Sequence, residues 1–215
     1  GEGMPELPEV QAMCALLERH CKGRCIERVV ARESGGGPRD GKFDTIVIAD
    51  GVRERDLVEA IAGRRVVGLM RLGKYLCMKL SGSGPHLVFH CGMTGSLSVD
   101  GVERFGFQSF SVDEAWPPRF TKLLIELRRS GGPTAKVAFS DPRRLGRIFL
   151  RADPMAEAPL SRLAPDPVAS SPLLPVEAFA DGLARAKGPV KAVLLDQAKV
   201  VCGVGNWIAD EALHA

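Results

Sequence analysis

The sequence predicts an α+β fold: an N-terminal β-sandwich with a leading α-helix, followed by the start of an α-helical domain. Three observations support this class. Short runs typical of strands, separated by glycine-rich turns, fill residues 25–150. Prolines crowd residues 152–175, and helical periodicity returns beyond them. We therefore expect a sandwich domain over residues 4–151, a proline-rich linker over 152–175 and a helical domain over 176–215.

The leading helix is expected over residues 8–22, because apolar side chains recur there every three or four positions and Gly23 provides a C-terminal stop. A second, short helix is indicated by Leu57 and Ile61, which are followed by Gly63. The expected strands are residues 25–31, 65–72, 75–80, 86–90, 121–127, 135–139 and 147–150.

The segment 152–175 contains too many prolines for a helix or an interior strand, since proline lacks the backbone N–H that both structures need. It is therefore expected to link two domains. After it, helices are expected over residues 176–186 and 189–200, and a third is expected to begin near Asn206. Asn206 is itself a favourable N-cap residue, and the free N–H groups at such a helix start bind phosphate well.

Composition excludes several classes of protein. With 45% hydrophobic residues, 215 residues suffice for one or two packed domains. No apolar run approaches the roughly 18 residues of a membrane span, and no charged and then apolar signal pattern opens the chain, so an intracellular protein is expected. The six cysteines form no C-x-x-C pair, which indicates buried thiols and no metal site.

The net charge of +3 does not by itself identify a nucleic-acid-binding protein, but the basic residues are clustered. They gather in residues 64–79, 119–129 and 143–151. If these segments belong to one sheet system, their side chains could line a cleft that faces phosphate groups. The alternative is an ordinary solvated, charged surface.

The N-terminal motif Met4-Pro5-Glu6 suggests covalent chemistry. Removal of the methionine would leave Pro5 as a free secondary amine, and an α-amino group titrates near about 8, so a useful fraction is uncharged at neutral pH. Such an amine can attack a sugar aldehyde carbon and form a Schiff base, and Glu6 is placed to move protons at that carbon. The alternative is that Pro5 and Pro8 simply begin a helix.

Five short segments, in this order, carry a resemblance to a known family. They are Pro-Glu-Leu-Pro-Glu-Val at 5–10, Leu-Gly-Lys-Tyr-Leu at 72–76, His-Cys-Gly-Met-Thr-Gly at 90–95, Asp-Pro-Arg-Arg-Leu-Gly at 141–146 and Gly-Val-Gly-Asn-Trp-Ile-Ala-Asp-Glu at 203–211. The chain resembles the formamidopyrimidine-DNA glycosylase and endonuclease VIII family of base-excision repair enzymes over essentially its whole length. The resemblance implies a helix-two-turn-helix domain truncated at Ala215. It places no cofactor in this fragment, and any zinc ion would belong to a finger beyond it.

The resemblance also implies catalytic residues. Pro5 and Glu6 match the reactive N-terminus of the family. Lys74 matches a lysine in the catalytic cleft that contacts the DNA backbone beside the lesion and assists proton transfer. For Lys74 the alternative is a charge at the entry of a strand, and a buried lysine there would need an anionic partner.

Three further residues match side chains that enter the duplex where the damaged nucleotide has been extruded. They are Met93, Arg143 and Leu145. Extrusion leaves a hole in the base stack that costs a few kcal/mol, so it must be refilled. An arginine can hydrogen-bond the orphaned base and an apolar side chain can wedge a base step. An aromatic residue is usual at the Leu145 position, so the wedge differs in shape here.

Phosphate contacts are implied for a separate set: Arg144, Lys187, Lys191 and Asn206. Asp141 is expected to orient the loop that carries Arg143 and Arg144 rather than to react. The four histidines show no ligand spacing, so they are assigned no catalytic role.

The expected function is therefore a bifunctional DNA glycosylase with lyase activity, acting as a monomer on double-stranded DNA that contains oxidised bases or abasic sites. Its expected location is the nucleus in a eukaryote and the cytoplasm otherwise. The alternative is a catalytically silent relative that only binds damaged DNA, because a peptide bond to Gly1–Met4 would remove the nucleophilicity of Pro5. An RNA-binding β protein is disfavoured, since no aromatic-rich strand motif is visible.

Overall fold

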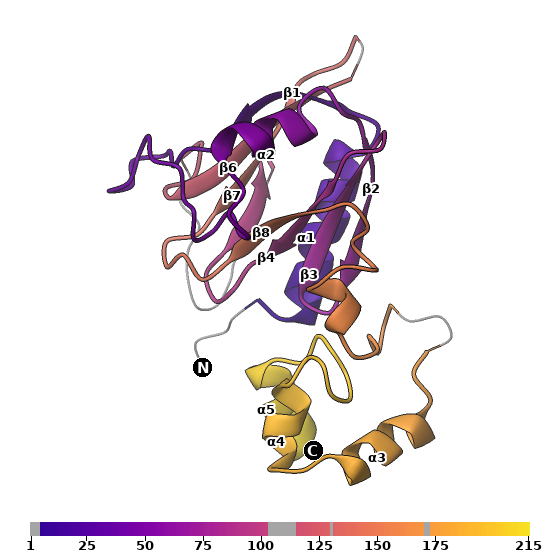
Figure 1. The fold of residues 1–215 in the computed structure, drawn as a ribbon. Helices are drawn as coiled ribbons and strands as arrows, with labels where there is room; N and C mark the ends of the chain where they lie inside the picture. The colour runs from indigo at the N-terminus through magenta and orange to yellow at the C-terminus, as the bar shows by residue number, and fades with distance from the viewer. Residues whose placement is uncertain (1–4, 103–114, 130, 170–172) are drawn as a thin grey trace.

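The computed structural model describes residues 5–102, 115–129, 131–169 and 173–215, and it forms a β-sandwich joined to a group of helices (Figure 1). One antiparallel sheet has the order β1 (Cys25–Val30), β6 (Thr121–Arg128), β7 (Ala135–Ser140) and β5 (Ser96–Val99). The other has the order β2 (Val66–Leu72), β3 (Tyr75–Leu80), β4 (His86–His90) and β8 (Arg147–Arg151). The predicted sandwich is confirmed.

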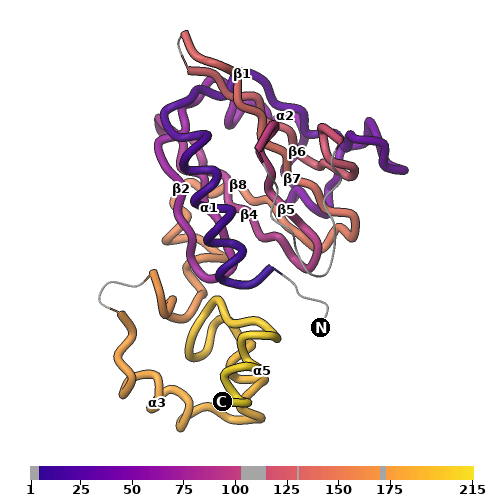
Figure 2. The backbone as a smooth tube through the Cα atoms, turned by 180° about the vertical axis from the view of Figure 1, so that it is seen from behind, coloured from indigo at the N-terminus to yellow at the C-terminus, as the bar shows by residue number. Residues whose placement is uncertain are grey.

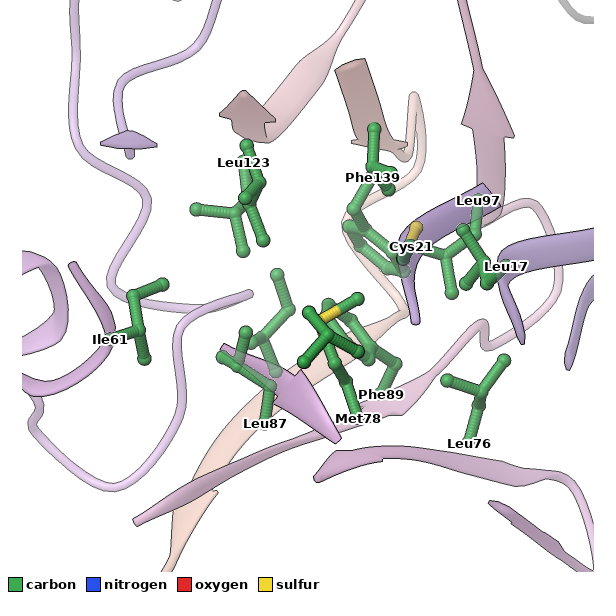
Figure 3. Close-up of a cluster of buried hydrophobic side chains, with 14 of the residues drawn as sticks. Leu17, Cys21, Ile61, Leu76, Met78, Leu87, Phe89, Leu97, Leu123 and Phe139 are labelled. Carbon is green, nitrogen blue, oxygen red and sulfur yellow. The ribbon is translucent and has the colours of Figure 1, made fainter. Parts of the chain in front are cut away.

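The core lies between the two sheets, where alternate side chains of each strand meet (Figure 3). Leu76 and Met78 of β3 point into it, and the rings of Phe89 and Phe139, one from each sheet, lie 5.9 Å apart. Burial of each such side chain contributes roughly 1.5–3 kcal/mol. The period of two along the strands therefore fixes which residues are inside.

Helix α1 (Leu7–Cys21) packs along the sandwich and contacts β2 and β3 of one sheet and β5 of the other (Figure 2). Its buried side chains belong to the same core, and three of them, Met13, Leu17 and Cys21, are 0% exposed. Helix α2 (Glu54–Ile61) buries Leu57 and Ile61, as predicted. The start of α1 therefore reaches the edge of the sandwich that faces the helical part of the chain.

The proline-rich segment is packed rather than free. It contains one 3-10 turn, η1 (Leu160–Arg162), which the proline count did not predict. Leu160 is 2% exposed and covers Cys77 and Val88 on the outer face of the second sheet. Further along, Asp166 is fully buried against Arg71 of β2. This segment thus adheres to the sandwich by both apolar and ionic contacts.

The helical part comprises α3 (Val176–Arg185), α4 (Val190–Leu195) and α5 (Asn206–His214). The helix expected over 189–200 is wrong beyond Leu195. There the Asp196 carboxylate accepts the N–H of Ala198 at 3.1 Å, a local turn that competes with helix. Within the ranges described, none of the helices has the length and apolar character needed to cross a membrane.

Candidate functional site

The N-terminal motif meets the start of α5, about 200 residues away along the chain. Pro5 is buried and Glu6 is 1% exposed. The Glu6 carboxylate accepts three backbone N–H groups, from Gly205 at 3.0 Å, Trp207 at 2.9 Å and Ile208 at 3.2 Å. A carboxylate at a helix N-terminus satisfies orphan donors and interacts favourably with the helix dipole. Glu6 is therefore held in one position beside Pro5.

This contact corrects two expectations about the helix start. Gly205, not Asn206, is the N-cap residue, and Asn206 is the exposed first residue of α5. The N–H groups expected to be free for phosphate are partly occupied, because Trp207 and Ile208 donate to Glu6. Position 205 also requires glycine, since a Cβ atom there would lie 2.3 Å from Cδ of Glu6.

Lys74 belongs to the same site. It follows Gly73 in the turn between β2 and β3, is 8% exposed, and donates from Nζ to the carbonyl of Val204 at 3.2 Å. Burial lowers the pKa of Lys74, and the nearby charge of Glu6 opposes that shift. A lysine with a lowered pKa gives up its proton more readily, as proton transfer requires.

Gln197 supports this arrangement and was not predicted. Its Oε1 accepts the N–H of Gly203 at 2.8 Å, and its Nε2 donates to the carbonyl of Val204 at 2.9 Å. The carbonyl that Lys74 contacts is thereby fixed. No sequence signal distinguishes such a glutamine from the many that lie on surfaces.

Two loops that carry predicted DNA contacts lie against each other. A Cβ atom at Gly92, whose φ is +59°, would lie 2.6 Å from the carbonyl carbon of Leu145, so the two backbones touch. Asp141 joins the loops: it accepts the hydroxyl of Thr94 at 2.7 Å and the N–H of Arg143 at 3.1 Å. The prediction that Asp141 orients its loop is confirmed.

These loops present the three predicted inserting side chains together. Arg143 is exposed, Leu145 is 41% exposed and Met93 is half-buried.

His90, for which no catalytic role was predicted, lies between Lys74 and the Met93 loop. Its Nδ1 accepts the N–H of Gly92 at 3.2 Å, and its ring lies 4.6 Å from that of Tyr75. Burial, together with the charges of Lys74 and Arg147, lowers the pKa of His90 to about 4. The imidazole is therefore neutral near pH 7 and positions the loop.

The expectation of a broad basic cleft is partly wrong. Several of the basic residues form hydrogen bonds or ion pairs inside the fold instead of facing a cleft. Arg64 donates to the carbonyls of residues 60, 81 and 84 and holds the turn between β3 and β4. Arg71 is buried against Asp166, and Lys122 is buried against Glu33 and Asp44.

The residues predicted to contact phosphate differ in exposure and in their ion-pair partners. Arg144 is 29% exposed and paired with Asp44. Lys187 is exposed between α3 and α4, whereas Lys191 forms an ion pair with Asp210 of α5. In the part of the chain that the structure describes, no group of three or more metal-ligating side chains occurs.

The β-sandwich meets the helical segment at the buried N-terminal motif, and comparisons with known proteins identify the family that has this arrangement. The family model "Formamidopyrimidine-DNA glycosylase N-terminal domain" matches residues 4–148, and "Formamidopyrimidine-DNA glycosylase H2TH domain" matches residues 163–215. The chain belongs to the formamidopyrimidine-DNA glycosylase family.

Relatives support this membership. The chain is 34% identical over 213 residues to formamidopyrimidine-DNA glycosylase of Arabidopsis thaliana, covering 98% of this chain and 50% of that protein. The corresponding protein of Thermus thermophilus is 36% identical over 212 residues, covering 98% and 63%. The chain thus spans about half to two thirds of the length of these relatives.

Solved structures show the same fold. The crystal structure of MutM (Fpg) from Thermus thermophilus matches with a TM-score of 0.67 at 31% identity, covering 97% of this chain and 63% of that one. Lactococcus lactis formamidopyrimidine-DNA glycosylase, non-covalently bound to DNA with an AP site, matches with a TM-score of 0.71 at 23% identity, covering 97% and 67%.

Proposed function

We propose that the protein containing this chain is a bifunctional DNA glycosylase and AP lyase that removes oxidised bases from duplex DNA. The observation that carries the proposal is that Pro5-Glu6 and Lys74 meet at the start of α5, which brings three distant parts of the chain together. The names of the relatives support the substrate class, and the Lactococcus lactis structure bound to DNA with an AP site supports a DNA partner.

In this mechanism the Pro5 amine attacks the sugar carbon C1′ of the extruded nucleotide, and the damaged base leaves with the electron pair of its glycosidic bond. Glu6 protonates the ring oxygen as the sugar opens, which leaves a Schiff base between Pro5 and C1′. Removal of a proton from C2′ then expels the 3′ phosphate and breaks the strand. Glu6 moves these protons, and Lys74 assists beside the backbone. This chemistry requires no cofactor.

DNA binding is divided between two sets of residues. Met93, Arg143 and Leu145 fill the hole left by the extruded nucleotide, and their adjacent loops support that role. The phosphate contacts, which set position rather than sequence, come from Arg144, Lys187, Lys191 and Asn206. We expect one copy of the protein to bind each lesion.

Borohydride reduction tests the covalent step. A protein that begins at Pro5, expressed in its longest natural reading frame, is expected to become trapped on a duplex with an abasic site. Peptide mapping should find the adduct at Pro5, because reduction fixes the Schiff base at its nitrogen. A matched protein that keeps the peptide bond between Met4 and Pro5 should bind the same duplex without trapping.

An adduct on Lys74 would overturn the assignment of the nucleophile. Mass spectrometry of the natural N-terminus decides between the enzyme and the catalytically silent relative, which would keep Pro5 blocked and still bind damaged DNA.

If Met93 and Arg143 fill the hole in the base stack, their replacement should weaken binding to damaged DNA more than to undamaged DNA. Met93→Ala and Arg143→Ala are each expected to weaken binding to a lesion duplex about tenfold or more, and to weaken binding to undamaged duplex much less, because only the extruded state contains the hole. Dissociation constants on the two duplexes measure this ratio. Met155→Ala, at a methionine 49% exposed in the linker, is the control and should change neither. Equal losses on both duplexes would reduce Met93 and Arg143 to ordinary contacts.

A further inference from the structure

Three positive groups surround one oxygen of a buried carboxylate, Oδ2 of Asp44. Nε of Arg144 lies 2.7 Å from it, Nζ of Lys122 lies 3.5 Å away and Nε of Arg39 lies 3.8 Å away. The side chains of Asp44 and Lys122 are 1% exposed, whereas those of Arg39 and Arg144 are 34% and 29% exposed. Two guanidinium groups therefore reach the surface above a buried acid.

Further carboxylates belong to this cluster. A second buried carboxylate, Glu33, forms an ion pair with Lys122 and lies 4.0 Å from Nε of Arg39. Asp141, a third buried carboxylate, also attracts Arg144. Three acids thus face three cations. The part of the cluster that reaches the surface is the two guanidinium groups, because Lys122 is enclosed and the two arginines are not.

Asp44 also fixes the direction of Arg144. It accepts hydrogen bonds from Nε at 2.7 Å and from Nη2 at 3.0 Å, a bidentate pair. A guanidinium has five N–H donors, so the Nη1 edge remains available. Arg144 itself has a φ of +57°, which a non-glycine residue adopts only when its surroundings impose it.

Asp44 keeps its charge at neutral pH. Burial pushes the pKa of Asp44 up, but hydrogen bonds from Arg144 and from the N–H groups of Val47 and Ile46 outweigh burial and lower it to about 2. Arg39 is held less firmly, because among the described residues its Nε–H has no hydrogen-bond partner. That Nε is buried beside Glu33 and Asp44, and the exposed third of the side chain can donate to an anion.

We propose that Asp44 presents Arg39 and Arg144 together as one binding site for a backbone phosphate of DNA. The proposal rests on the proposed function, and it adds Arg39 as a DNA contact and Asp44 as a positioning residue. A phosphate group offers two anionic oxygens, and arginine binds such groups with paired N–H donors. Arg143 and Leu145 flank Arg144, so a phosphate held here sets the register of the side chains that fill the hole.

Salt titration of binding tests the site. The full natural protein is titrated with a duplex that carries a tetrahydrofuran abasic analogue, and log Kd is plotted against log salt. Arg39→Gln and Arg144→Gln should each reduce the slope by about one unit and weaken binding to lesion and undamaged duplex alike. Arg55→Gln is the matched control, since Arg55 is exposed on α2 and pairs only with Glu59 of the same helix in the described structure. Its slope should equal that of the wild type.

Asp44→Asn distinguishes the positioning of the two arginines by Asp44 from the effect of net charge on DNA binding. The variant gains one positive charge, so unoriented electrostatic attraction alone would tighten binding. Loss of the oriented pair should instead weaken binding about tenfold, even though the variant is more basic. Thermal unfolding of each variant shows the folded fraction, and Arg39→Gln alters a partly exposed side chain that should leave folding intact.

An unchanged salt slope in Arg39→Gln would overturn the phosphate site, and tighter binding by Asp44→Asn would overturn the positioning role. A wild-type protein that fails to prefer the abasic duplex would overturn the proposed function instead, so the two failures are distinguishable.

Discussion

Replacement of Glu6 by glutamine is expected to slow base removal by two or more orders of magnitude while binding to abasic duplex changes less than about threefold. Glutamine keeps the shape of the side chain but has no proton to exchange, and general acid–base catalysis contributes about 10²–10⁴-fold. Single-turnover base release and the dissociation constant of an uncleavable abasic duplex measure the two quantities separately.

The structure adds a second effect to this substitution. The Glu6 carboxylate accepts N–H groups from Gly205, Trp207 and Ile208, and an amide offers only one acceptor oxygen to them. Glu6→Gln should therefore also lower the free energy of unfolding by roughly 1–3 kcal/mol. Rates must be measured well below the unfolding temperature of the variant.

Glu9→Gln is the matched control, because Glu9 accepts the backbone N–H of Glu6 at 3.1 Å and has only a structural role at the same helix start. It should lower stability without the loss in rate. Base release unchanged in Glu6→Gln would eliminate Glu6 as the acid, and an equal loss of rate in both variants would reduce Glu6 to a helix cap.

Arg71→Met is expected to lower the free energy of unfolding by roughly 3–5 kcal/mol, since it leaves the charge of Asp166 buried without its partner. The side chains of Arg71 and Asp166 are 2% and 0% exposed. Arg71 also donates to Gln11 at 2.8 Å and to the carbonyl of Gly73 at 2.9 Å. For a protein of this size the expected fall in Tm is on the order of 10 °C.

Calorimetry or urea unfolding measures this loss. Arg28→Met is the control, because Arg28 pairs with Glu126 on the surface and its side chain is 66% exposed; such pairs contribute about 0–1 kcal/mol. A loss in Arg71→Met no larger than that of the control would show that Asp166 is adequately held by the N–H groups of Gly73, Val168 and Ala169.

Sequence periodicity was sufficient to predict most strands of the sandwich, because each strand buries alternate apolar residues and ends at a turn. It missed β5 (Ser96–Val99), which is short and carries two serines. Its buried Leu97 and Val99 alternate as a strand requires, but four residues are too few for a pattern to stand out. Pairing with β7, a tertiary contact, is what makes this segment a strand.

The roles of charged residues were harder to predict, because their partners are distant in sequence. Lys122 sits in a basic run, yet the carboxylates of Glu33 and Asp44 enclose it. Asn206 has the ideal chemistry for an N-cap, yet Glu6 supplies the acceptor from about 200 residues earlier in the chain. A sequence motif could therefore identify candidate site residues, but the partners of these residues could be found only from the fold.

The contact between Glu6 and α5 also bears on when the protein becomes active during synthesis. The donors that fix Glu6 come from Gly205, Trp207 and Ile208, and these residues leave the ribosome well after the strands of the β-sandwich. Until then the Glu6 carboxylate lacks these three donors. A nascent sandwich should thus hold Glu6 loosely, and the carboxylate should reach its final position only when α5 docks against it.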